Sequence, residues 1–203
     1  MNINIMGIFP TPIAKIDLDR ELSFIEKEFI CNQSTNAHLA NDIVKQSENT
    51  NILDNIILSD LKDFFQKSLD IFFQEWFKPS TNVCLKITQS WANYSNIGRS
   101  HVRHNHPNSI ISGVFYVNTN QNSDKIIFCK QIQGYHINPT EYNLWNTSDW
   151  WFHSEEGTLL LFPSTLEHYV PPVVGEKERI SISFNSFFSG EIGLANRYTQ
   201  LIV

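Results

Sequence analysis

The sequence of 203 residues has no excess of basic side chains and no long apolar run. It carries 15 Lys and Arg against 21 Asp and Glu, which gives a formal net charge of −6. A protein that grips the phosphate backbone of nucleic acids needs a dense basic face, so this balance argues against a general nucleic-acid binder. No stretch approaches the roughly 18 consecutive apolar residues of a membrane-spanning helix, so we expect no membrane segment.

Cysteine is also scarce. Only Cys31, Cys84 and Cys129 are present, and no CxxC pair occurs, which argues against a zinc site built from thiolates. We interpret the three as free thiols in a reducing compartment and expect Cys84 and Cys129 to lie in the core. The N-terminus lacks the basic segment and apolar run of a signal peptide, so the expected location is cytoplasmic.

What the sequence does contain is core material, since 41% of its residues are hydrophobic and 13% are aromatic. This favours a folded chain over a disordered one. We expect a single domain over residues 1–203. Residues 1–80 would form a strand or arm with supporting helices, and residues 81–203 a β core.

Two helices are expected in the first part. One runs from about Asp19 to Ile30, and the clearer one runs from Ser59 to Phe77, with Ser59 as its N-cap. Pro79 should end the second helix. Residues 3–16 read as an edge strand or extended arm, and residues 32–51, rich in Asn and Ser, as a loop.

Short β-rich runs dominate the rest of the chain. Their Gly, Pro and Asn punctuation is typical of an all-β sandwich or barrel. The expected strands are residues 83–94, 110–117, 125–130, 150–153, 158–162, 167–170 and 178–188.

Histidines are clustered within this β-rich part. His101, His104 and His106 fall within six residues, and His168 lies in a later strand. Residues i and i+2 of a strand face the same side, so His104 and His106 could aim at one point and His168 could complete a metal site. Neutral imidazole suits iron, copper, zinc and nickel. The alternative, surface or hydrogen-bonded histidines in a polar loop, stays open on spacing alone.

The run from Arg179 to Asn185 alternates between polar and apolar side chains. Its polar face begins with Arg179, so it predicts either an inward-facing anion site or a solvated outer face. A guanidinium suits a carboxylate because its planar fork contacts two oxygens and keeps its charge when desolvated.

Together, these residues resemble the 2-oxoglutarate/iron(II) oxygenase superfamily, and more closely the prolyl-hydroxylase-like oxygenases of bacteria and tailed phages. The resemblance covers almost the whole chain. It rests on the segments Phe9-Pro10-Thr11-Pro12, Ser90-Trp91-Ala92-Asn93, His104-Asn105-His106-Pro107-Asn108-Ser109, Ser112-Gly113-Val114-Phe115-Tyr116-Val117, Gly157 to Ser164, His168, and Arg179-Ile180-Ser181 through Phe184-Asn185.

The resemblance implies a double-stranded β-helix, a jelly-roll or cupin-like fold, behind N-terminal supporting helices. It implies Fe(II) ligands at His104, His106 and His168. This sequence departs from the family pattern at His106, where relatives usually carry Asp or Glu. A site with three imidazoles would leave the metal more positively charged, which the dianionic cosubstrate could balance.

The resemblance also implies a site for 2-oxoglutarate. Arg179 matches the arginine that binds its C5 carboxylate, with Ser181 as the hydroxyl partner. Tyr116 would contact the same carboxylate, and Asn93 the metal-bound end. These last two side chains could equally be satisfied polar groups of the core.

The implied function is a 2-oxoglutarate- and O2-dependent Fe(II) dioxygenase, a hydroxylase whose substrate is unidentified. A protein side chain or a small molecule is favoured over nucleic acid, and a homodimer stays open. Two rival hypotheses are a three-histidine cupin-like metalloenzyme that does not use 2-oxoglutarate and a metal-free jelly-roll binding or structural module.

Overall fold

Two antiparallel sheets face each other in a computed structural model that describes residues 3–36, 44–79, 82–130 and 138–203. The large sheet has the order β1 (Ala14–Asp17), β9 (Thr158–Pro163), β6 (Ile111–Asn118), β11 (Arg179–Ile192), β4 (Val83–Ser95), β3 (Lys45–Ser47) and β2 (Thr35–Asn36), and β12 (Leu201–Ile202) pairs with β11. The small sheet has the order β5 (His101–His104), β10 (His168–Val170), β7 (Lys125–Cys129) and β8 (Asp149–His153). This mainly β, jelly-roll arrangement confirms the expected fold class.

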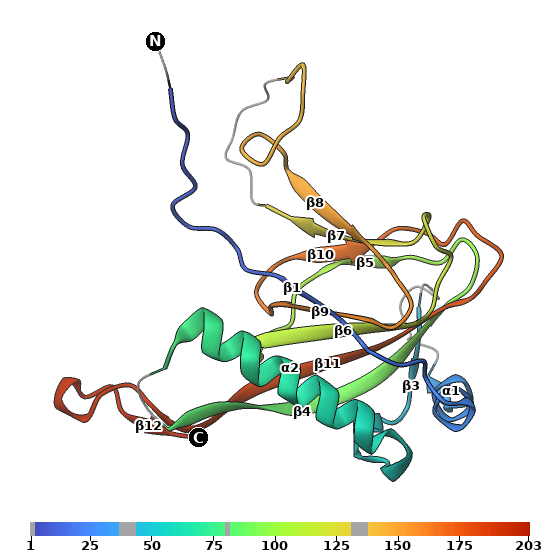
Figure 1. Ribbon diagram of the computed structural model, residues 1–203, viewed down its shortest axis with the longest axis horizontal. Helices are drawn as coiled ribbons and strands as arrows, with labels where there is room; N and C mark the ends of the chain where they lie inside the picture. Colours follow the sequence, from blue (N-terminus) through green and yellow to red (C-terminus); the bar gives the residue numbers. More distant parts are fainter. Residues whose placement is uncertain (1–2, 37–43, 80–81, 131–137) are drawn as a thin grey trace.

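Helix α2 (Ser59–Phe77) crosses the outer face of the large sheet, on the side away from the small sheet (Figure 1). Leu61, Phe65, Leu69 and Phe73 recur at helical spacing, and all four are buried. The ring of Phe65 lies 5.2 Å from that of Phe115 and 5.4 Å from that of Phe184. These sheet residues therefore form one apolar core with the helix.

A second apolar cluster fills the space between the two sheets. Its buried members are Val114, Tyr116, Ile126, Phe128, Leu160 and Phe162. Along β6, Val114 and Tyr116 belong to this inner cluster, whereas Phe115 and Val117 belong to the helix-side core. The sheet is thus covered on both faces, which explains why β6 is apolar almost throughout.

Most expected strand boundaries are right to within a few residues, and α2 spans the expected Ser59–Phe77. Its cap is different, because Leu58 occupies the N-cap position without a side-chain hydrogen bond and Ser59 already has helical geometry. The helix ends as expected just before Pro79, with Lys78 in the left-handed region.

The first helix starts later than expected. Helix α1 (Phe24–Cys31) begins after Ser23, whose hydroxyl accepts from the backbone N–H of Glu26 while the Glu26 carboxylate accepts from the Ser23 backbone N–H. Such a capping box is a strong start signal, so the expectation of Asp19 was wrong. The hydrogen bond from Arg20, which outweighs the desolvation of the carboxyl, holds the pKa of Glu26 down at about 2.

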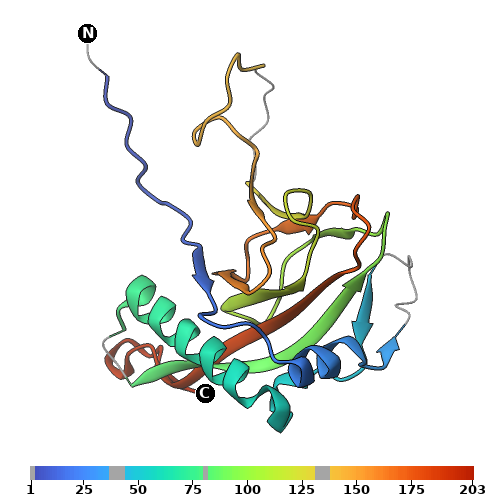
Figure 2. The same ribbon diagram turned by 45° about the vertical axis from the view of Figure 1, so that its right-hand side comes forward.

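Residues 32–51 are not only a loop. Within them, β2 pairs with β3, and β3 in turn pairs with β4, so the segment widens the large sheet. Residues 37–43, including His38, lie outside the described part of the chain. At the other edge, residues 3–13 form an extended, mostly exposed arm that leads into β1, as Figures 1 and 2 show.

All three cysteines are free, and only Cys129 is buried. The expectation that Cys84 belongs to the core was wrong, because alternation along β4 buries Val83 and Leu85 and turns Cys84 outward. Among the described helices, none is long and apolar enough to cross a membrane.

Removal of the Phe65 ring should unfold the chain more easily. Phe65→Ala opens a cavity between α2 and the sheet and should lower the free energy of unfolding by about 3–5 kcal/mol. Phe24→Ala is the matched control, because Phe24 is 77% exposed and its loss should cost within about 0.5 kcal/mol. Urea denaturation of both variants measures this, and equal midpoints would show that α2 does not anchor the sheet.

Candidate metal centre

A cavity opens between the two sheets, at the end of the sandwich where β11 begins. Its wall combines polar side chains with apolar ones such as Val114 and Phe162 on the large-sheet side and carries histidines on the small-sheet side. The residues that line it include Trp91, Asn93, Tyr116, Arg179, Ser181 and Ser183 from the large sheet, and His101, His104, His168 and Val170 from the small sheet, with His106 between them.

Three of these histidines converge. His104 ends β5, and His168 begins β10 directly opposite it in the strand register. Nitrogen atoms of His104, His106 and His168 all lie within 4.8 Å of one another. This separation suits three ligands on one face of a single metal ion.

His106 lies near the other two histidines for a different reason from the one expected. Strand β5 ends at His104, so His104 and His106 do not share a strand face. Instead, the backbone N–H of His106 donates to the carbonyl of Ser164, 2.9 Å away, after β9. This hydrogen bond to the residue after β9 therefore holds His106 beside His104 and His168.

Backbone carbonyls orient two of the rings. Nδ1 of His104 lies 2.7 Å from the carbonyl oxygen of Val102, and Nδ1 of His168 lies 2.9 Å from that of Leu166. A hydrogen bond of this kind places the proton on Nδ1 and leaves Nε2 as the metal-ligating atom. Both rings are thus set in the orientation and tautomer that a ligand needs.

Burial keeps His106 and His168 neutral. Desolvation, together with a contribution from His168 and His104, lowers the pKa of His106 to about 3. Desolvation also lowers the pKa of His168 to about 4, although its hydrogen bond to Leu166 opposes the shift. A protonated imidazole cannot bind a metal, so these low values keep the ligands ready well below neutral pH. The donor set therefore fits a divalent transition metal ion.

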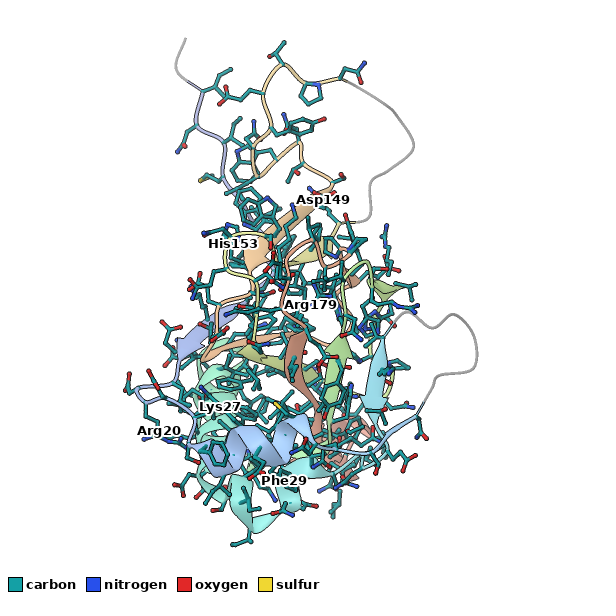
Figure 3. The ribbon with its side chains drawn as sticks, turned by 90° about the vertical axis from the view of Figure 1, so that its right-hand side faces the viewer. Arg20, Lys27, Phe29, Asp149, His153 and Arg179 are labelled. Atoms are coloured by element: carbon teal, nitrogen blue, oxygen red, sulfur yellow. The ribbon has the colours of Figure 1, made fainter. Side chains whose placement is uncertain are left out.

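Arg179 lies in the interior at the start of β11 (Figure 3). Its side chain is 6% exposed and forms an ion pair with Asp124, whose side chain is 1% exposed. Nη1 of Arg179 donates to Oδ1 of Asp124 and to the carbonyl of Pro171, both at 3.3 Å. Burial lowers the pKa of Arg179, and Asp124 opposes that shift. Arg179, Ser181 and Ser183 of β11 line the cavity, so the solvated alternative does not hold for them.

Asp124 had no signal in the sequence, because it lies in a polar turn between β6 and β7. It accepts hydrogen bonds from the backbone N–H and the side-chain Nδ2 of Asn120, at 2.8 and 3.2 Å. The Asn120 amide also donates to the carbonyl of Lys177 and accepts from its backbone N–H. Asn120 thus joins this turn to the segment that leads into Arg179.

Tyr116 contributes a buried hydroxyl that completes no hydrogen bond of normal geometry to a described residue, although the Ser154 hydroxyl lies nearby. It lies on β6 opposite Ser181 in the register with β11, and both line the cavity. Burial raises the pKa of Tyr116 to about 12, so the hydroxyl stays protonated and can donate. A buried donor left free inside a cavity is a feature of a site that receives an acceptor from a ligand.

Asn93 also lies in the cavity wall, but the protein already uses its amide. Its Oδ1 accepts from Gln46 and Trp91, and its Nδ2 donates to the hydroxyls of Ser183 at 2.9 Å and Ser181 at 3.5 Å. The geometry suits a residue that holds the serine hydroxyls rather than one that binds a ligand directly.

One protein-family model matches just under half of the chain. Residues 89–185 match the model of a protein family described as "Putative 2OG-Fe(II) oxygenase". The matched segment runs from β4 into β11 and contains His104, His106, His168 and Arg179. No curated protein sequence matches the chain.

Solved structures with this oxygenase fold include three that cover most of the chain. A Pseudomonas putida prolyl-4-hydroxylase has a TM-score of 0.58 at 12% identity, over 86% of this chain and 92% of that one. HygX from Streptomyces hygroscopicus, crystallised with nickel, 2-oxoglutarate and hygromycin B, has a TM-score of 0.57 at 10% identity, over 87% and 82%. The viral collagen prolyl hydroxylase of Paramecium Bursaria Chlorella virus-1, in a 2-oxoglutarate complex, has a TM-score of 0.53 at 12% identity, over 86% and 94%. At these identities the likeness shows the fold.

The buried histidines of the cavity should make the metal-free protein sensitive to acid. The unfolded chain protonates its histidines near pH ~6.5, whereas folded His168 and His106 do so only near pH 4 and 3. The unfolded state therefore binds more protons in this window, and stability should fall as the pH drops from about 6.5 towards 4.

Urea denaturation at a series of pH values measures this loss. The double variant His106→Gln/His168→Gln lacks both groups, so its stability should depend less steeply on pH. An equal slope in both proteins would show that the two histidines are not buried in the neutral form.

Proposed function

We propose that this chain is a 2-oxoglutarate- and O2-dependent Fe(II) dioxygenase that oxidises a C–H bond of its substrate. The observation that carries the proposal is one cavity that holds both a cluster of three imidazoles and a buried arginine. Neither the histidine cluster nor the buried arginine would support this function alone. A metal cluster without the arginine would suit the cupin-like rival, and an arginine without the cluster would suit a binding module.

His104, His106 and His168 would hold Fe(II) in this proposal. Iron with 2-oxoglutarate supplies the oxidising chemistry, in which the cosubstrate is converted to succinate and carbon dioxide. The His104 and His168 rings need no reorientation on binding, because the carbonyls of Val102 and Leu166 already hold them. His106 stands where the family usually has a carboxylate and would serve as a third neutral ligand.

Arg179 would bind the C5 carboxylate of 2-oxoglutarate. Its two hydrogen bonds to described residues both use Nη1, which leaves donors of the guanidinium fork for a ligand. Tyr116 would donate its unpartnered hydroxyl to the same carboxylate. Ser181 lies beside both in the strand register and would add its hydroxyl, held by Asn93.

We infer that the substrate is a protein side chain or a small molecule. The net charge of −6 disfavours nucleic acid. Exposed aromatic side chains, which suit such ligands, gather on β8 and the segment before it, at Tyr142, Trp145, Trp150 and Trp151. Tyr135 and His136 of the same segment lie outside the described residues. The free thiols support a reducing, cytoplasmic location, and a homodimer stays a hypothesis.

Iron content tests the ligand set. His104→Ala and His168→Ala should each lose iron while the fold survives, because truncation at a cavity wall removes binding energy without opening the apolar core. Plasma mass spectrometry with circular dichroism measures both quantities. His153→Ala is a suitable control, since His153 is outside the cluster. Full iron occupancy in the two ligand variants would contradict the assignment.

Arg179→Lys should weaken 2-oxoglutarate binding. Lysine keeps the positive charge opposite Asp124 but replaces the planar fork by a single ammonium, so a charge-assisted hydrogen bond is lost. Such a bond contributes roughly 1.5–3 kcal/mol, which corresponds to about ten- to a hundredfold weaker binding. Anaerobic titration of the metal-to-ligand absorption band measures the affinity.

Arg20→Lys is the matched control for that titration. Arg20 also pairs with a carboxylate, that of Glu26, but it lies away from the cavity, so binding should be unchanged. If Arg179→Lys binds 2-oxoglutarate like the parent, Arg179 is not the anchor. Release of succinate from 2-oxoglutarate by the iron-loaded parent tests the function itself, and its absence under all conditions would favour the rivals.

A further inference from the structure

A β-bulge in the small sheet brings a fourth histidine into the cavity. The register pairs His168 with His104 but Val170 with His101, so Val102 and Arg103 together stand opposite a single residue of β10. Residues three apart on a regular strand face opposite sides, whereas one extra residue restores them to the same side. The bulge therefore turns the His101 side chain to the face that carries His104.

The ring of His101 lies against that of His104. Their centroids are 4.3 Å apart and their planes differ by 27°, which is a stacked arrangement. His101 lines the same cavity as Arg179 and the histidine cluster, although it is not one of the three histidines whose nitrogens converge. A molecule that occupied this cavity and contacted the metal would therefore lie beside His101.

The nitrogen atoms of His101 make no hydrogen bond to any described residue. This contrasts with His104 and His168, whose Nδ1 atoms are tied to backbone carbonyls. Because His104 is already oriented by Val102, the stacked ring is not needed to hold it. An imidazole offers an N–H donor in either protonation state, so His101 brings a free donor to the cavity.

We propose that His101 is a cosubstrate-positioning residue, whose ring N–H donates to an oxygen of the oxo-acid end of 2-oxoglutarate. The inference rests on the proposed function and adds a residue to it. Arg179 would hold one end of the cosubstrate and His101 would orient the other, next to the metal. The β-bulge allows this second contact, because it turns the His101 side chain toward the cavity.

Two substitutions test the N–H donor of His101 independently of its aromatic ring. His101→Phe keeps an aromatic ring that can stack on His104 but lacks the N–H, and His101→Gln keeps a donor but lacks the ring. His101→Leu, which also lacks the donor, takes the place of the Phe variant if that variant does not fold. Val174→Ala is the control, because the Val174 side chain is 80% exposed and does not line the cavity.

The affinity for 2-oxoglutarate is measured by calorimetry on zinc-loaded protein and by anaerobic titration of the iron form, beside the metal affinity of each variant. The Phe variant should bind 2-oxoglutarate about ten- to a hundredfold more weakly, with unchanged metal affinity. The Gln variant should recover part of the loss, and the control should match the parent.

Two results would overturn the proposal while leaving the proposed function intact. One is a Phe variant that binds 2-oxoglutarate like the parent. The other is a variant that loses metal affinity but binds 2-oxoglutarate normally once loaded, which would make His101 a support of His104 alone. If the metal-loaded parent itself does not bind 2-oxoglutarate, the proposed function and this inference fall together.

Discussion

The buried guanidinium of Arg179 is the constraint on which the site depends. An isolated charge is costly to bury, so Arg179 requires a fixed partner, which Asp124 supplies. Asp124 is held by Asn120, and Asn120 also fixes the backbone of Lys177 just before β11. The connection between the sheets, the start of β11 and the cavity wall are therefore parts of one polar network.

Charge balance offers a reason for the unusual third histidine. Fe(II) with three neutral imidazoles carries two positive charges, which the two carboxylates of 2-oxoglutarate would offset, while Asp124 offsets Arg179. The formal charges of such a site sum to zero. A carboxylate in place of His106 would add an uncompensated negative charge to a site whose formal charges already cancel. His106 and Asp124 are thus complementary features of one buried site.

The parts of the fold that follow a regular period could be predicted from the sequence. Helix α2 and strand β11 are examples, because each has one apolar face that must be buried. Positions set by distant contacts could not be predicted. His106 is held by Ser164, and β3 forms only because β4 offers it an edge.

The residues of the site also divide into those that the sequence could predict and those that only distant contacts determine. Spacing and residue type suggested His104, His106, His168 and Arg179 as candidates, and the structure places all four around one cavity. Asp124 could not be found in this way, because a single acidic residue in a turn has no distinctive pattern. His101 was visible as a histidine, but only the bulge in β5 decides which way it faces.

A crystal structure of the protein grown anaerobically with iron and 2-oxoglutarate tests the central claim most directly. The account predicts anomalous density for one metal ion bound by Nε2 of His104 and His168 and by a ring nitrogen of His106. It also predicts 2-oxoglutarate chelating that metal, with its C5 carboxylate on Arg179 and Tyr116. A metal-free cluster, or 2-oxoglutarate bound away from Arg179, would contradict it.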